Sequence, residues 1–394
     1  MSTVGILGGG QLARMLALAG APLGLKFRVL DANAEACAGQ FAPLTVADYA
    51  DLDALADFAR EVDVVTFDFE NVPAPSATWL AERLPVYPNP GALALAQDRL
   101  AEKRLFADLG LATPAFAVVD SHAELVAASA IIGFPCILKT RRLGYDGKGQ
   151  MRLKSAADID PAWAALGPAP LILEAFVAFE RELSVLAVRG RDGEFRSYPL
   201  TENWHREGVL AASLAPARVR AAVAAQAIAA ARAIADRLAY VGVFALELFD
   251  CGGRLLANEL APRVHNSGHW TIEGADCSQF ANHLRAVLGL PLGSTAARAS
   301  SVMLNWVGEL PDRRVILAQA GGYFHDYGKS PRPGRKLGHA TLTADSPAAL
   351  YPVLQAVVNE LGRAQEFAPA LSALAEGEWG IIGSDNSDRN RPPE

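Results

Sequence analysis

The first part of the chain, up to residue 94, alternates between strand-like and helix-like patterns, and this alternation constrains the fold more than any other feature. Short apolar runs predict strands at residues 4–7, 27–31 and 62–69. Ala- and Leu-rich stretches predict helices from residue 12 onward and at residues 51–60. Strands that alternate with helices form βαβ units around a parallel sheet. We therefore predict a Rossmann-like N-terminal domain over residues 1–94, ending in a Pro- and Gly-rich segment.

Beyond residue 94 the pattern becomes typical of antiparallel sheets. A helical stretch over 95–109 is followed by strands joined through short turns, at 134–140, 151–154, 171–177 and 182–190. A long helix is predicted over 216–238, and two apolar runs, 242–250 and 254–260, flank Cys-Gly-Gly and predict a β-hairpin. We expect a central domain over 95–295, a small C-terminal domain over 296–383 and a disordered polar tail over 384–394, in a fold that combines α/β and α+β architecture.

The composition is that of a soluble globular protein, with 51% hydrophobic and 20% charged residues. A formal net charge of −7 argues against a general nucleic-acid-binding protein, which needs a basic surface. No apolar run approaches the roughly 18 residues of a membrane-spanning helix. The N-terminus enters a strand pattern by Val4 without a signal sequence, so we expect a cytoplasmic protein. The four cysteines form no paired motif, which favours buried free thiols over disulfides or a zinc site.

One motif near the N-terminus suggests a dinucleotide-binding protein. Gly8, Gly10 and Ala13 follow a strand and open a helix, and Asp31 ends the next strand, where an NAD-binding protein keeps its ribose-binding acid. The physical basis of the motif is more general, because glycines let backbone amides approach any anion at a helix N-terminus. An NAD-dependent dehydrogenase therefore stays an alternative that the rest of the chain must decide.

A glycine-rich loop follows the predicted strand that ends at Lys139. Its sequence, GYDGKGQ over residues 144–150, contains three glycines and Lys148. Such a loop can fold its backbone amides over a polyphosphate while the two lysines supply positive charge. A glycine-rich hairpin turn is the alternative. A second segment, EAFV at 174–177, follows a buried strand, and its backbone could bind adenine. Glu182 could accept hydrogen bonds from the ribose hydroxyls. The alternative is a surface acid that follows a strand and has no ligand.

Two glutamates lie within apolar strands of the predicted hairpin, Glu247 in FALELF and Glu259 in LLANEL. An unpaired buried carboxylate costs several kcal/mol. If the turn centres on Gly252, Glu247 faces Ala257 and Glu259 lies one diagonal further along the same face, about 7–8 Å away. At that separation the two acids can share one or two Mg²⁺ ions that bridge ATP phosphates. Ion pairs with Lys or Arg are the alternative explanation.

Just beyond this strand, the segment APRVHNSGHW at 261–270 crowds five polar side chains into seven residues without a helical pattern, namely Arg263, His265, Asn266, Ser267 and His269. This density, next to a predicted metal-binding strand, favours an anion-binding loop.

Taken together, these segments carry a family resemblance. The segments are GILGGGQLARML, TFDFENV, LGYDGKGQ, EAFVAFERELSV, NELAPRVHNSGHW and YGKSPRPGRKLGH. In this order, from Val4 to about Ile382, the chain resembles the N5-carboxyaminoimidazole ribonucleotide synthases, which are ATP-dependent carboxylases of purine biosynthesis in the ATP-grasp superfamily. The resemblance implies an ATP-grasp fold, usually as a homodimer, that uses ATP, Mg²⁺, bicarbonate and 5-aminoimidazole ribonucleotide.

The resemblance also implies roles for individual residues. The expected ATP-binding residues are Arg99, Lys139, Gly144, Tyr145, Asp146, Gly147, Lys148, Gly149, Gln150, Glu174, Ala175, Phe176, Val177, Glu182, His205, Asn258 and Glu259. Glu247 and Glu259 would hold Mg²⁺. The ribonucleotide would contact Gly10, Gln11, Glu70, Asn71, Tyr145, Asp146, Arg263, Asn266, Ser267, Lys329, Arg335 and Lys336. Catalytic roles would fall to Lys139, Asp146, Lys148, Arg263 and His269, with Asp146 and His269 as candidate general bases.

Several alternatives share part of this pattern. A formate-dependent glycinamide ribonucleotide transformylase and a biotin carboxylase would keep the glycine loop and the paired acids. The segments NSGHW and GRKLGH favour the synthase over both. A non-catalytic nucleotide-binding module would bind ATP without releasing ADP, and a dehydrogenase would leave Glu247, Glu259 and the lysine-containing loop unexplained.

Overall fold

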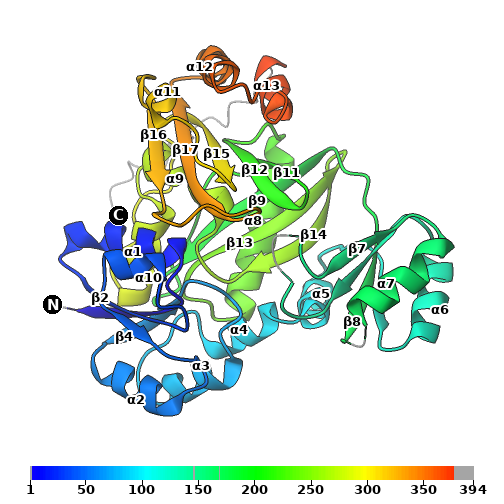
Figure 1. The fold of residues 1–394 in the computed structure, drawn as a ribbon, viewed down its shortest axis with the longest axis horizontal. Helices are drawn as coiled ribbons and strands as arrows, with labels where there is room; N and C mark the ends of the chain where they lie inside the picture. Colours follow the sequence, from blue (N-terminus) through cyan, green and yellow to red (C-terminus); the bar gives the residue numbers. More distant parts are fainter. Residues whose placement is uncertain (1, 145–146, 168, 377–394) are drawn as a thin grey trace, which may run out of the picture.

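The computed structural model describes residues 2–144, 147–167 and 169–376, and these residues form three β-sheets. Figure 1 shows the N-terminal sheet beside a long sheet that continues into the C-terminal part, while the smallest sheet stands apart with its own helices. The predicted tail, 384–394, lies outside the described residues. The predicted combination of α/β and α+β architecture, with a Rossmann-like N-terminal part, agrees with these sheets and their helices.

The N-terminal sheet is parallel and has the order β3-β2-β1-β4. Its strands are β1 (Thr3–Leu7), β2 (Lys26–Asp31), β3 (Leu44–Val46) and β4 (Val64–Phe67), with α1 (Gln11–Gly20), η1 (Ala21–Leu23), η2 (Cys37–Gln40), α2 (Leu52–Arg60), α3 (Ala74–Ala81) and α4 (Pro90–Ala96) in the connections. One face packs on α1 and the other on α2 and α3 (Figure 1). This is the predicted βαβ arrangement, in which both faces of a parallel sheet are covered.

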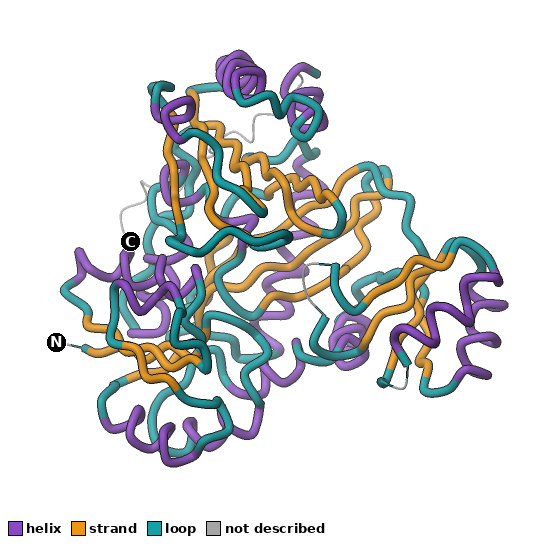
Figure 2. Tube along the Cα trace, viewed as in Figure 1, coloured by secondary structure: helices purple, strands orange, loops and turns teal. Residues whose placement is uncertain are grey.

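The smallest sheet is antiparallel and has the order β5-β8-β6-β7. Its strands are β5 (Phe116–Val119), β6 (Cys136–Thr140), β7 (Gln150–Leu153) and β8 (Leu171–Ala175), with α6 (His122–Ile132), η3 (Ala156–Asp158) and α7 (Ile159–Leu166). The two α-helices cover one face of this sheet (Figure 2) and pack on it through a separate apolar core. Ile137 and Lys139 of β6, which are not part of that core, line a cavity between this sheet and the rest of the molecule.

The long sheet is antiparallel and has the order β14-β13-β9-β11-β12-β15-β17-β16, with β10 paired to β9. Its strands are β9 (Arg181–Arg189), β10 (Phe195–Ser197), β11 (Thr201–Arg206), β12 (Val209–Ala215), β13 (Gly242–Cys251), β14 (Arg254–Ala261), β15 (Ser300–Val307), β16 (Gly322–Asp326) and β17 (Lys336–Ala344). Strand β15 pairs with β12, for example Ala212 with Leu304. The sheet therefore runs across the domain boundary that we predict at residue 295.

Helices accompany this sheet: α5 (Arg99–Asp108), α8 (Ala221–Arg237), η4 (Asn266–Gly268), α9 (Thr271–Gly274), α10 (Gln279–Leu288), α11 (Arg313–Leu317), α12 (Pro347–Glu360) and α13 (Ala368–Ala375). The predicted helix over 95–109 is interrupted because Asp98 caps a new helix, accepting a hydrogen bond from Leu100 N at 3.0 Å. Helix α8 begins later than predicted because Arg220 is extended, with φ −65° and ψ 146°. The predicted boundary after residue 94 falls within α4.

Two smaller expectations need correction. The segment 261–270 is not wholly irregular, because His265 caps the short helix η4 by accepting a hydrogen bond from Ser267 N. The four cysteines are free, as predicted, but only Cys37 and Cys136 are buried, and Cys251 and Cys277 are half-buried. Among the described residues, none of the helices combines the length and the apolar character needed to span a bilayer.

Candidate active site

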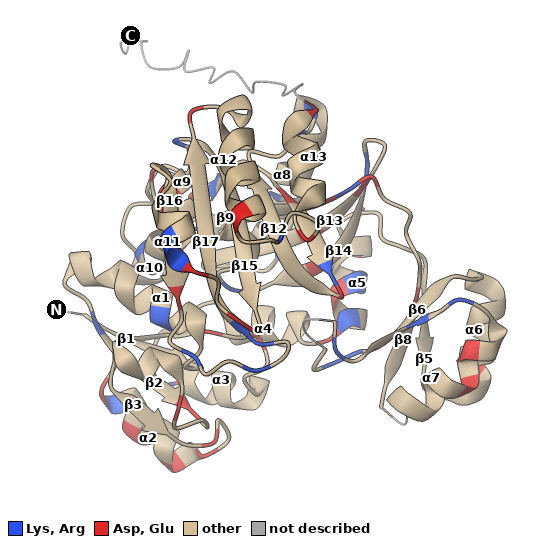
Figure 3. Ribbon diagram, turned by 45° about the horizontal axis from the view of Figure 1, so that its top comes forward, with Lys and Arg blue, Asp and Glu red and all other residues tan. Residues whose placement is uncertain are grey.

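A cavity of about 780 Å³ lies where the three sheets meet. It is lined by most of the predicted site residues: Gly10, Gln11, Glu70, Asn71, Arg99, Lys139, Gly147, Lys148, Gln150, Glu174, Ala175, Phe176, Val177, Glu182, His205, Glu247, Asn258, Glu259, Arg263, Asn266, Lys329, Arg335 and Lys336. Residues that are hundreds of positions apart in the sequence thus share one chamber. Charged residues of both signs cluster around α5 and the neighbouring ends of β13 and β14 (Figure 3).

Some predicted residues are not part of this lining. Gly144, Gly149 and Ser267 lie outside it. Tyr145 and Asp146 lie outside the described residues, so their predicted roles stay predictions.

His269 requires a correction as a candidate general base. Its side chain is 1% exposed and does not line the cavity. Its Nδ1 lies 3.1 Å from Gln279 Nε2, and its ring packs against those of Phe280 and His339. Burial and the neighbouring His325 lower the pKa of His269 well below its usual value. The residue is therefore a neutral core histidine.

Glu247 and Glu259 lie directly opposite each other on β13 and β14. The turn between these strands is Gly252-Gly253, whose φ values of +69° and +95° explain why two glycines occupy it. The predicted pairing of Glu247 with Ala257 is wrong, because Leu248 pairs with Ala257 and a β-bulge follows. The bulge adds Asn258 to β14 and makes Glu247 and Glu259 direct cross-strand partners, which lie closer together than the predicted diagonal pair.

In this arrangement the negative charge of Glu259 disfavours ionisation of Glu247. Burial and the facing Glu259 raise the pKa of Glu247 from 4.5 to about 7. Glu259 accepts a hydrogen bond from Arg99 at 2.9 Å, and His265 Nε2 lies 3.5 Å from Glu247 Oε1. Burial and nearby Arg263 lower the pKa of His265 well below its usual value, so it supplies no charge to Glu247. The Glu247 carboxylate therefore lies beside a second carboxylate and a neutral imidazole.

These residues fit a magnesium ion. Mg²⁺ prefers oxygen ligands and is commonly held by one or two carboxylates together with substrate phosphates. The site offers two carboxylates with the Asn258 side chain beside them in the same cavity. A divalent cation between them would relieve the repulsion that raises the pKa of Glu247.

Lys139 and Glu174 form a buried ion pair on neighbouring strands β6 and β8, with Nζ and Oε2 2.9 Å apart. Lys103 of α5 lies 3.6 Å from the other carboxylate oxygen. Burial alone would raise the pKa of Glu174, but Lys139 and Lys103 lower it to about 2. Glu174 is therefore ionised, and it holds the Lys139 ammonium at the edge of the cavity.

The end of the cavity near this pair is apolar. The segment 175–177 lines it together with Ile137, and the rings of Phe179 and Phe249 stack there with centroids 4.9 Å apart. Apolar side chains and stacked aromatic rings at this end suit a purine base, which supports the predicted adenine contacts. At the polar side of this end His205 hydrogen-bonds Glu182, and this bond raises the pKa of His205 in spite of its burial.

The opposite end of the cavity belongs to the N-terminal sheet and a basic loop. Arg263 donates to Glu70, and Lys329 donates to Gln11. Arg335 and Lys336 line the same end, as does Arg332, which the sequence analysis did not single out. This end therefore combines positive charge with fixed polar groups, as an anionic substrate requires.

The dinucleotide motif is explained by the same region. Gly9 N donates to Asp31 at 2.6 Å, and Gly10 N and Ala13 N donate to Asp68 at 3.0 and 2.7 Å. Two carboxylates thus occupy the backbone amides that would bind a pyrophosphate in a dehydrogenase. Burial raises the pKa of Asp68 in spite of these bonds. The geometry argues against a dinucleotide at this helix.

Sequence reasoning missed several cavity residues and their supports, among them Asp68, Glu102 and Lys103. Glu102 and Lys103 are each 1% exposed although they are charged. Their spacing from Arg99, three and four positions along α5, places all three on one helix face. That spacing of three charged residues was the available signal.

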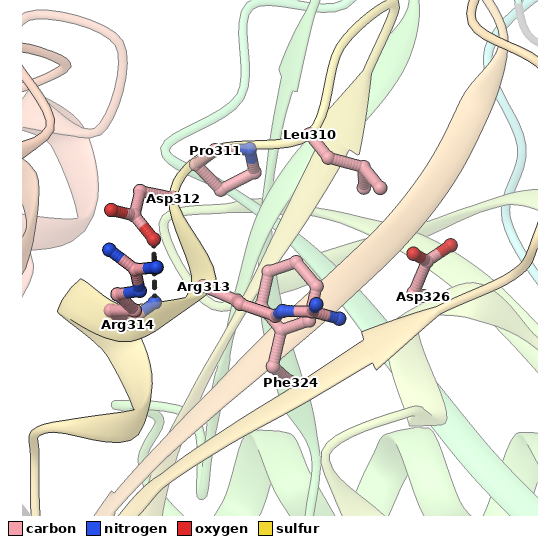
Figure 4. A pocket seen from close by; sticks show the side chains of 7 residues that line it. All are labelled: Leu310, Pro311, Asp312, Arg313, Arg314, Phe324 and Asp326. Atoms are coloured by element: carbon pink, nitrogen blue, oxygen red, sulfur yellow. Dashed lines mark hydrogen bonds between the residues drawn. The ribbon is translucent and has the colours of Figure 1, made fainter.

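A second cavity of about 470 Å³ lies at the surface of the C-terminal part (Figure 4). It is lined by Leu310, Pro311, Asp312, Arg313, Arg314, Phe324 and Asp326. Asp312 there caps α11 by accepting a hydrogen bond from Arg314 N at 2.9 Å. This second lining contains none of the predicted site residues.

Three family models match the chain in sequence order. They describe a ribonucleotide synthetase preATP-grasp domain over residues 1–97, an ATP-grasp domain over 104–280 and a phosphoribosylaminoimidazole carboxylase C-terminal domain over 301–351.

Curated relatives and solved structures agree with these models. The N5-carboxyaminoimidazole ribonucleotide synthase of Pseudomonas aeruginosa is 54% identical over 347 residues, which cover 88% of this chain and 96% of the relative. The crystal structure of the synthetase from Thermus thermophilus is 53% identical, with a TM-score of 0.87 over 91% of this chain and 98% of that one.

A more distant structure, the Aspergillus clavatus synthase in complex with ADP and 5-aminoimidazole ribonucleotide, is 32% identical, with a TM-score of 0.85 over 92% of this chain and 99% of that one. The expected family resemblance is thereby confirmed. The chain is an ATP-dependent carbon–nitrogen ligase with an ATP-grasp fold, and it belongs to the N5-carboxyaminoimidazole ribonucleotide synthase family.

Proposed function

We propose that the chain carboxylates 5-aminoimidazole ribonucleotide to N5-carboxyaminoimidazole ribonucleotide in de novo purine biosynthesis, with consumption of ATP and bicarbonate. One observation carries this proposal: a single cavity joins an apolar end, two facing carboxylates and a basic end. The apolar end suits adenine, the carboxylates suit metal-bound phosphates, and the basic end suits a ribose phosphate. The names and bound ligands of the family members support the same assignment.

In this reaction an oxygen of bicarbonate attacks the γ-phosphorus of ATP, and the bond from that phosphorus to the ADP oxygen breaks. The product is carboxyphosphate. The exocyclic amine then attacks its carboxyl carbon, or carbon dioxide released from it, while inorganic phosphate departs and the amine gives up a proton.

The chain's own residues supply what the first step requires. Negative charge grows on the transferring phosphoryl group, and Lys139 and Lys148 line the cavity where they can neutralise it. Glu174 holds the Lys139 side chain in place through their 2.9 Å hydrogen bond. Glu247 and Glu259, with Asn258, would hold Mg²⁺, which supplies Lewis-acid stabilisation of the phosphates when it is bound.

The second step depends on positioning. Lys329, Arg335 and Lys336 would anchor the ribose phosphate, which fixes the distant amine near the reacting carbon. Glu70, held by Arg263, faces the same part of the cavity. Asp146 is the remaining sequence-based candidate for the general base. The loop at 144–150 would limit the access of water to the labile intermediate.

Three finer expectations belong to the same proposal: dependence on Mg²⁺, a homodimer and a cytoplasmic location. The paired carboxylates support the first, and the family resemblance supports the second. The third follows from the need for ATP and the intermediates of nucleotide synthesis. Sedimentation velocity would test the homodimer directly.

An ADP-release assay tests the whole assignment. We expect ADP formation that requires bicarbonate and rises when 5-aminoimidazole ribonucleotide is added. Formate with glycinamide ribonucleotide should not replace these substrates, and biotin should not act as the acceptor. ADP release that depends on formate instead would overturn the proposal in favour of the transformylase.

A further inference from the structure

Strand β14, which carries Glu259, lies at one edge of the long sheet. The outer backbone groups of an edge strand have no neighbouring strand to pair with, and buried ones need other partners. The β-bulge at Asn258 disturbs the strand's pairing further, just before Glu259. The position of this carboxylate therefore depends on what satisfies the outer side of the strand.

The Ala112 carbonyl accepts a hydrogen bond from Ala257 N at 2.7 Å, and helix α5 supplies further partners through three side chains. Glu102 Oε1 accepts a hydrogen bond from Leu260 N at 2.6 Å. Lys103 Nζ donates to the carbonyl of Asn258 at 3.0 Å. Arg99 donates to the carboxylate of Glu259 itself at 2.9 Å. One turn of helix thus holds the residues before and after Glu259 as well as its side chain.

Lys103 has a second connection. Its ammonium lies 3.6 Å from Glu174 Oε1, on the smallest sheet, while it also contacts the bulge on the long sheet. A charged side chain that is 1% exposed would be costly to bury without such partners. Lys103 therefore links the strand that aims Lys139 to the strand that carries Glu259.

From this geometry we infer that Glu102 and Lys103 are positioning residues for magnesium binding, because they hold the bulged strand so that Glu259 faces Glu247. Neither side chain lines the cavity, so both act through Glu259. The inference rests on the proposed magnesium-dependent function of this site. Residues that orient metal-binding groups typically contribute roughly 10–100-fold to metal affinity or activity.

The test compares Lys103→Met, Glu102→Leu and Glu102→Gln with the wild type. The control is Arg104→Met, which removes a cation from the exposed side of the same helix. The affinity for Mn²⁺ in the presence of ADP is measured from the free-ion signal in electron paramagnetic resonance. The Mg²⁺ concentration for half-maximal ADP release and the KM for the ribonucleotide are measured in parallel.

We expect Lys103→Met and Glu102→Leu to weaken Mn²⁺ binding and raise the half-maximal Mg²⁺ concentration by about 10-fold or more, with the ribonucleotide KM unchanged within about twofold. Glu102→Gln keeps a carbonyl oxygen for Leu260 N and should stay near wild type, as should Arg104→Met. Unchanged Mn²⁺ affinity in Glu102→Leu, or equal loss in Glu102→Gln and Glu102→Leu, would overturn the inference. If Lys103→Met does not fold, the comparison of Glu102→Leu with Glu102→Gln is sufficient to test the inference.

Failure of this inference is distinguishable from failure of the proposed function. Binding of Mn²⁺ with ADP needs no ribonucleotide, so the positioning role can be tested whatever the acceptor is. Conversely, a wild-type protein that releases no ADP with 5-aminoimidazole ribonucleotide and bicarbonate contradicts the function and leaves the metal measurement intact.

Discussion

Replacing Glu247 by Gln should stabilise the metal-free protein while it removes activity. Burial and Glu259 raise the pKa of Glu247 from 4.5 to about 7. A raised carboxyl pKa means that the folded state favours the protonated form. The wild type therefore loses stability as pH rises from about 4.5 to about 7, and the full cost is present above pH 7.

The size of this cost follows from the pKa difference. At 1.36 kcal/mol per unit, the change from 4.5 to about 7 corresponds to roughly 3 kcal/mol, an upper value because the side chain is 20% exposed. Loss of the 3.5 Å contact with His265 should offset less than about 1 kcal/mol, since that imidazole is neutral. For a chain of 394 residues, roughly 3 kcal/mol corresponds to a melting temperature higher by about 4 °C.

The assay is calorimetric unfolding of both proteins at pH 5 and pH 8 in a metal chelator, with Glu309→Gln as an exposed control. Glu247→Gln should melt above the wild type at pH 8, and the gap should shrink at pH 5. Magnesium with ADP should raise the melting temperature of the wild type more than that of the variant. A variant that melts below the wild type at pH 8, or a gap independent of pH, would refute the reasoning.

Further predictions concern the metal, the ribonucleotide and the glycine loop. Glu259→Gln should abolish bicarbonate-dependent ADP release with an unchanged circular dichroism spectrum, and release at the wild-type rate would contradict the metal role. Lys336→Ala should raise the ribonucleotide KM by roughly 10–100-fold, the value of a charged hydrogen bond, with little change in the ATP KM; an equal rise in both would place the basic loop elsewhere. Gly208→Val should raise the ATP KM while the ribonucleotide KM stays constant, because a Cβ at this position, with φ +79°, would lie 2.8 Å from Gly147 Cα. An unchanged ATP KM would mean that the loop does not need this close approach.

Local patterns predicted part of the fold. The strands at 4–7 and 27–31 and the hairpin over 242–260 were predicted with small errors at their ends, because apolar runs and glycine turns depend on residues close together in sequence. Helices α6 and α7 and strands β11 and β12 were not predicted. The errors arose at particular residues. Asp98 divides the helix predicted over 95–109, and the extended Arg220 delays the start of α8.

Chemical groupings were harder to predict than elements. The residue type of His269 and its polar sequence neighbours suggested a catalytic base. In the structure, Gln279 and Phe280 of α10 contact its ring and enclose it in the core. The glycine motif resembles a dinucleotide site in sequence. In the structure, Asp68, which follows β4, accepts hydrogen bonds from its backbone amides. In both cases a segment distant in sequence decided the role, and no local spacing records that contact.

By itself, the sequence determined that two glutamates lie in paired apolar strands and that a lysine precedes a glycine-rich loop, because alternation and turn chemistry are local properties of the chain. Only the tertiary structure decided that Glu247 and Glu259 face each other directly, because a bulge at Asn258 shifts the register by one residue. It also decided what holds that bulge, since Glu102 and Lys103 reach it across more than 150 positions of sequence. Register and long-range hydrogen bonding depend on how separate elements pack, and a side-chain pattern within one element does not specify them.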